Sequence, residues 1–67
     1  MNIDKLKGKI KERGFTVKDF AEKIGVDRTS LYRKLNNAER ITIGEADRMK
    51  ETLNLSNAEA TEIFFAE

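Results

Sequence analysis

A glycine at position 25 divides residues 16–37, TVKDFAEKIGVDRTSLYRKLNN, into two short segments with helical hydrophobic patterns. In the first segment the apolar residues recur at spacings of three and four, at Val17, Phe20, Ala21 and Ile24. Glycine adopts a left-handed backbone without steric cost, so Gly25 is suited to end a helix. The stretch therefore predicts one helix over 17–24, a tight turn, and a second helix over about 28–36.

Both predicted helices carry starting signals at their first turns. The Thr16 hydroxyl can accept a hydrogen bond from an N–H of the opening turn, and Asp27 can do the same for the second helix. Phe15 and Phe20 have the spacing of a hydrophobic staple, which fixes the angle at which the chain enters the helix. The two helices are therefore expected to have well-defined starts.

The second helix has one apolar and one polar face. Leu31 and Leu35 are its expected buried residues. At about 100° per residue, the opposite face is contiguous and contains no carboxylate; it consists of Arg28, Thr29, Tyr32, Arg33 and Asn36. Hydrogen-bond donors and small acceptors on one helix face are what reading base edges in the major groove requires.

These residues resemble the helix-turn-helix of the phage repressor and Cro family. The resemblance lies in the spacing of a small residue, a turn glycine and a buried leucine, at Ala21, Gly25 and Leu31. A small side chain lets the two helices cross closely, and glycine makes the sharp turn. The resemblance implies an all-α fold, a compact five-helix domain that spans residues 1–67, with the helix-turn-helix at its second and third helices.

The resemblance also implies roles for particular side chains. The base contacts are expected from the polar face, Arg28, Thr29, Tyr32, Arg33 and Asn36, and the phosphate contacts from Lys18, Lys34 and Arg40. The alternative for the charged residues is an ordinary solvated face. The alternative for Tyr32 is packing of its ring on a neighbouring helix. The family often has glutamine where this chain has Val17, which favours a packing role for that valine.

The composition excludes several chemistries. The 67 residues include no cysteine and no histidine, so a thiolate metal site and the usual general base are both impossible. No nucleophile and base are paired in the sequence, and we therefore expect no enzyme activity, no cofactor and no metal. No apolar run has the length of a membrane span or a signal sequence, which predicts a cytoplasmic protein without a membrane partner.

Charge is distributed unevenly along the chain. Residues 1–40 hold eleven Lys and Arg against six Asp and Glu (11 − 6 = +5), and residues 41–67 hold two against six (2 − 6 = −4). This pattern suggests a dipolar domain whose amino-terminal part attracts phosphate. Chance clustering on solvated helix faces is the alternative.

Three further helices complete the expected fold. The first covers 2–13, with an interior Gly8 that either permits a close helix crossing or is a plain imperfection. Two capping boxes, Thr42 with Glu45 and Ser56 with Glu59, start the fourth and fifth helices. The fifth helix is expected over about 57–65. The fourth is expected to turn an apolar face inward, made of Ile43, Ala46, Met49 or Lys50, and Leu53.

Phe65 follows Phe64 directly, and in so short a helix both rings cannot face one small core. Phe65 therefore either covers the domain edge or contacts a second copy of the chain. We favour the second, because the resembling family usually binds DNA as a twofold dimer. The chain shows no second domain, which makes it more similar to a Cro-type regulator than to a two-domain repressor.

Two functions of different classes follow from these features. The first is a sequence-specific DNA-binding regulator of transcription. It would act as a homodimer on a palindromic operator, with no small-molecule ligand. The alternative is a protein-interaction module on the same fold, such as an antitoxin, in which the acidic last helices and Phe65 would hold a protein partner.

Overall fold

The structure, a computed structural model, describes residues 1–37 and 41–65. These residues form five short helices. They are α1 (Ile3–Glu12), α2 (Val17–Ile24), α3 (Arg28–Asn37), α4 (Ile43–Leu53) and α5 (Asn57–Phe64). These residues contain no strand. The all-α prediction is confirmed, and each predicted helix agrees with the observed one to within a residue or two.

Each helix begins at a side-chain cap, and for α2 to α5 the sequence indicated that cap. The Asn2 side chain accepts from the Lys5 N–H, and the Thr16 hydroxyl accepts from the Asp19 N–H at 3.1 Å. Both capping boxes form with their reciprocal hydrogen bonds. Such caps satisfy N–H groups that have no partner within the helix, so the helix boundaries follow from local chemistry.

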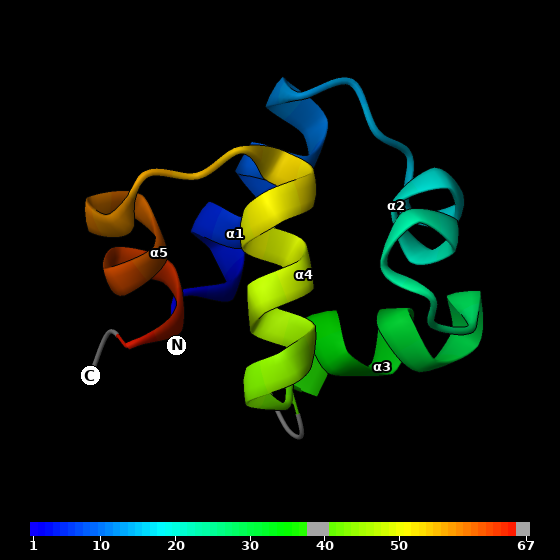
Figure 1. The fold of residues 1–67 in the computed structure, drawn as a ribbon. Helices are drawn as coiled ribbons and strands as arrows, with labels where there is room; N and C mark the ends of the chain where they lie inside the picture. The colour runs from blue at the N-terminus through cyan, green and yellow to red at the C-terminus, as the bar shows by residue number, and fades with distance from the viewer. Residues whose placement is uncertain (38–40, 66–67) are drawn as a thin grey trace.

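The helices pack around one hydrophobic core, with α4 at the centre (Figure 1). In this view α2 and α3 lie on one side of α4 and α5 lies on the other. Helix α2 packs against α3 and α4, while α1 packs against α3 and α5. Every helix contributes to the core, whose largest fully buried side chains are Phe20, Leu6, Ile24, Leu31, Met49, Leu53 and Ile63.

The first and last helices are joined by polar contacts. The Asn2 N–H donates to the Ile63 carbonyl at 2.7 Å. Lys5 of α1 pairs with Glu62 of α5. Lys9 of α1 pairs with Glu59 of α5 at 2.6 Å, and the pair raises the pKa of Lys9 above its ordinary value. The two ends of the described chain therefore lie side by side (Figure 1).

One prediction about α4 is wrong. The sequence predicts Ile43 on the inner face, but its side chain is 81% exposed. The buried residues of α4 are Glu45, Met49 and Leu53, which follow each other at a spacing of four. Ile43 lies about 120° around the helix from Met49, and so falls outside that stripe.

Candidate nucleic-acid interface

The turn between α2 and α3 has the geometry that the glycine indicated. Gly25 is left-handed, with φ 75° and ψ 29°. The Val26 N–H donates to the Ala21 carbonyl at 3.0 Å, and the Gly25 N–H donates to the Glu22 carbonyl at 3.3 Å. These two bonds form a Schellman motif, which closes the end of α2 and sends the chain sharply into α3.

Helix α3 is anchored through its inner face. The Asp27 carboxylate accepts from the N–H groups of Thr29 and Ser30 at 3.0 and 3.3 Å. Leu31 and Leu35 are buried in the core, as predicted. The five side chains predicted to contact bases are all exposed on the other side of the helix, at Arg28, Thr29, Tyr32, Arg33 and Asn36. The structure therefore brings these five together on one open surface, which we call the α3 outer face.

Tyr32 remains on this surface rather than in the core. Its side chain is 44% exposed. The Arg28 guanidinium lies over the tyrosine ring, 5.8 Å from its centroid. This cation–π contact between residues one helical turn apart restricts both side chains before any ligand arrives. Of the two alternatives for Tyr32, the structure favours the outer face.

The predicted phosphate contacts have different surroundings. Lys18 is exposed in the first turn of α2, next to Val17, which is half-buried against the core. Val17 thus has the packing role that the sequence favoured. Arg40 lies outside the residues that the structure describes.

Lys34 pairs with the carboxylate of Glu45, for which the sequence predicts only a role in a capping box. Its Nζ donates to both carboxylate oxygens of Glu45, at 2.8 and 2.6 Å. Glu45 is 6% exposed and also accepts from the Thr42 N–H at 3.0 Å. Burial, the largest influence, raises the pKa of Glu45, but the hydrogen bonds from Lys34 and Thr42 together with the Lys34 charge outweigh it and lower the pKa. No periodicity could have revealed this pair, because its members lie on different helices.

The fold brings the two oppositely charged parts of the sequence together. Three ion pairs join residues 1–37 to residues 41–65: Lys5 with Glu62, Lys9 with Glu59, and Lys34 with Glu45. Part of the charge asymmetry of the sequence is therefore neutralised by pairing within the fold. In contrast, Lys18, Arg28 and Arg33 pair with no carboxylate among the described residues. Positive charge is thus left on the α3 outer face and at the start of α2.

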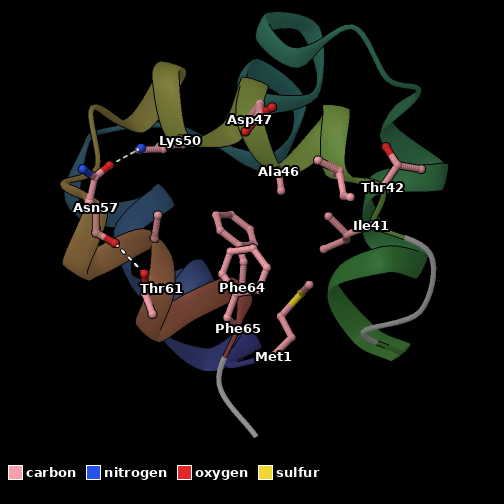
Figure 2. Close-up of a pocket in the computed structure, with 12 residues that line it drawn as sticks. Met1, Ile41, Thr42, Ala46, Asp47, Lys50, Asn57, Thr61, Phe64 and Phe65 are labelled. Atoms are coloured by element: carbon pink, nitrogen blue, oxygen red, sulfur yellow. Dashed lines mark hydrogen bonds between the residues drawn. The ribbon is translucent and has the colours of Figure 1, made fainter.

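A second surface feature lies away from the α3 outer face. An apolar groove of about 320 Å³ runs between α4 and α5 (Figure 2), and its lining includes Met1, Ile41, Ile43, Ala46, Phe64 and Phe65. Phe64 is 9% exposed and Phe65 is 73% exposed, so the prediction that the two rings cannot both face the core is confirmed. The exposed Ile43, which was expected on the inner face of α4, extends the apolar rim of this groove.

Comparisons with known proteins agree with this geometry. A family model described as the Cro/C1-type HTH DNA-binding domain matches residues 5–64. Searches of curated proteins and of solved structures each gave no significant match.

Within residues 1–37 and 41–65, no helix has the length and apolar character needed to cross a membrane. The family match covers α2 to α5 and all of α1 except its first two residues, and it includes the Gly25 turn and the α3 outer face. The chain therefore belongs to the family of Cro/C1-type helix-turn-helix DNA-binding domains.

Proposed function

We propose that this protein is a sequence-specific regulator of transcription that reads the major groove of double-stranded DNA with α3. The observation that carries the proposal is the α3 outer face, an exposed helix surface without a carboxylate on a helix whose other side is buried. An α-helix fits the major groove of B-DNA, where each base pair presents a distinct pattern of donors and acceptors. A carboxylate-free face can approach phosphates on both sides of the groove without repulsion.

The five side chains of the α3 outer face divide into two kinds of base contact. Arg28 and Arg33 present forked guanidinium donors that match the two acceptors of guanine. Thr29, Tyr32 and Asn36 supply shorter polar groups, of which the asparagine amide matches adenine. Because Arg28 stacks on Tyr32, these two residues form a preordered unit that loses less side-chain freedom on binding.

Phosphate contacts position α3 without reading sequence. Lys18 and the N-terminus of α2 provide positive charge, and Arg40, which follows α3 in the sequence, provides a second cation. Arg40→Ala is expected to weaken binding to all duplexes alike and to lower the salt slope by about 1. A salt slope that does not change would remove Arg40 from the interface.

Two copies of the chain would bind a palindromic operator. We place the contact between them at the α4–α5 groove, because it exposes Phe65, Ile43 and Met1, which are large apolar side chains. A twofold interface uses the same surface on both partners, and it would cover these side chains in pairs.

Selection of bound duplexes from a random DNA pool tests the proposed function directly. A palindromic enriched motif with a fixed half-site spacing is expected. No enrichment of any sequence, with binding that depends only on salt, would overturn sequence-specific reading.

Arg33 tests the role of the α3 outer face. Arg33→Ala should lose discrimination at one base pair of each half-site, at a cost of about 1–3 kcal/mol per contact. Arg33→Lys is the matched control, because it keeps the charge but loses the fork. The lysine variant should retain affinity for random DNA and still lose discrimination. Equal losses on specific and random DNA would instead make Arg33 a phosphate contact.

Phe65 tests the groove. Phe65→Asp should leave the circular dichroism spectrum unchanged, separate the two subunits in sedimentation, and weaken full-site binding more than half-site binding. Ala58→Asp introduces the same charge on an exposed position of α5 outside the groove lining and should change none of these. Unchanged sedimentation and full-site affinity in the Phe65 variant would place the dimer contact elsewhere.

A protein-interaction module, such as an antitoxin, is the second candidate. The apolar α4–α5 groove favours it, since exposed apolar surface of this kind commonly marks a protein contact. In this function the groove would hold a different protein rather than a second copy. A monomeric wild-type protein that gives no enriched DNA sequence would favour this candidate over the first.

A further inference from the structure

Glu45 is the one charged side chain that is buried among the residues the structure describes. Its carboxylate is shared between two elements. The Thr42 N–H binds it within the start of α4, and the Lys34 ammonium binds both of its oxygens from the last turns of α3. The pair therefore connects the helix that carries the α3 outer face to the helix that forms one wall of the groove.

A pair of this kind contributes more to geometry than to stability. Removing two charges from water is costly, and replacing a buried ion pair with apolar side chains is often neutral or stabilising. The contact between Lys34 and Glu45 is also directional, because one ammonium must meet two oxygens at 2.8 and 2.6 Å. Helix α3 packs against α2 and α1, and the pair adds a directional link from α3 to α4.

We propose that Lys34 and Glu45 form a positioning pair that fixes the angle of α3 relative to α4, so that Lys34 serves sequence discrimination without touching DNA. The proposal rests on the proposed function, in which α3 reads bases. It replaces the phosphate contact that the sequence suggested for Lys34. If the groove joins two copies, the same angle also sets how the two α3 helices are presented to the two half-sites.

Glu45→Gln is the most informative variant. Glutamine can still accept from the Thr42 N–H, so the capping box is kept while the ion pair to Lys34 is lost. If the pair positions α3, the ratio of affinities for the selected site and for random duplex should fall by about threefold to tenfold. The ratio of affinities is the correct measure, because removal of a negative charge strengthens binding to every duplex alike. Such a uniform gain in affinity cancels in the ratio.

Lys34→Met completes the test, because methionine keeps an apolar stem of similar length without the ammonium. The affinity ratio should fall in this variant as well, and the double variant should be no worse than the worse single one, as expected for residues that act through one contact. Lys18→Met is the control for a phosphate contact. It should weaken binding to both duplexes equally and lower the salt slope by about 1.

A phosphate role for Lys34 predicts the opposite pattern. Glu45→Gln would then release the ammonium toward DNA and strengthen binding to both duplexes with an unchanged ratio, while Lys34→Met would behave like Lys18→Met. That combination would overturn the positioning pair. Because Glu45→Gln retains the cap, it remains informative even if Lys34→Met fails to fold.

A measurement without DNA separates this proposal from the proposed function. In amide NMR spectra of the free protein, Glu45→Gln should shift resonances along α3 as far as Arg28 and Thr29, since the whole helix changes its angle. Shifts confined to the neighbours of residues 34 and 45 would overturn the positioning pair, whether or not the protein selects a DNA sequence. Failure to select any sequence would overturn only the proposed function.

Discussion

Gly25→Ala and Gly8→Ala are expected to change the stability of the domain in opposite directions, although both add one methyl group. The difference comes from the backbone. Gly25 has φ 75°, whereas Gly8 lies inside α1 and is not among the positive-φ glycines. A Cβ added at either position meets no atom within 4 Å. Steric contact with the rest of the protein is therefore excluded as the cause, and only the conformational preference of the residue remains.

The magnitudes follow from these conformations. A side chain in the left-handed region costs about 1–2 kcal/mol, and alanine in a helix interior gains about 0.5–1 kcal/mol over glycine. For a domain of this size about 1 kcal/mol shifts Tm by roughly 4–8 °C. Gly25→Ala should therefore lower Tm by about 4–16 °C, and Gly8→Ala should raise it by about 2–8 °C. Gly25→Val should lose more, since a branched Cβ resists positive φ further.

Thermal unfolding followed by circular dichroism at 222 nm, the usual helix wavelength, measures all three variants against the wild type. Reversibility is checked by a second scan. A Gly25→Ala variant that melts at or above the wild-type temperature would refute the left-handed turn, and with it the Schellman geometry that directs the chain into α3. A Gly8→Ala variant that melts lower would instead show that α1 requires a close approach at this position.

Two further predictions concern contacts between helices. The hydrogen bond from Lys9 is the largest cause that lowers the pKa of Glu59 to about 2, from an ordinary value of 4.5. The stabilising effect of the ionised Glu59 is therefore complete above about pH 4.5 and is lost as the pH falls toward 2. Between these pH values, the free energy of unfolding measured in urea should fall less for Glu59→Gln than for the wild type. Equal falls in the two proteins would contradict the assignment. The Arg13 Nε donates to the Leu53 carbonyl at the end of α4, at 3.0 Å. Arg13→Met should cost about 1 kcal/mol in urea unfolding, while Arg48→Met, at an exposed position on α4, should be neutral within about 0.5 kcal/mol.

The features that could be predicted from the sequence are those set by neighbours along the chain. A cap joins residues two or three positions apart, as in Thr16 with Asp19, so its geometry is present in the local sequence. The outer face of α3 was also predictable, because Leu31 and Leu35 determine which side is buried. The polar residues on the opposite side of the helix must then lie on the protein surface.

The rotation of α4 could not be predicted in the same way. Its sequence offers Ile43 as an apolar candidate, but the helix turns Glu45 inward instead. The buried position of the Glu45 carboxylate is stabilised by Lys34, which lies on another helix and supplies the ammonium that a buried carboxylate needs. A pattern within one helix contains no information about a partner eleven residues away, so the buried pair and the exposed isoleucine were missed together.

The hydrogen bond between Asn2 and Ile63 also constrains when the protein can fold. Closing a loop of about sixty residues costs on the order of 3–4 kcal/mol of chain entropy, before any contact between α1 and α5 is gained. The helices themselves can form in about a microsecond. During synthesis, however, α1 leaves the ribosome first and must wait for α5, its neighbour in the finished domain, to emerge. The core around Leu6 and Ile63 is therefore completed only after α5 has been made, and a nascent chain halted before α5 lacks the packing between α1 and α5 that holds α1 in place.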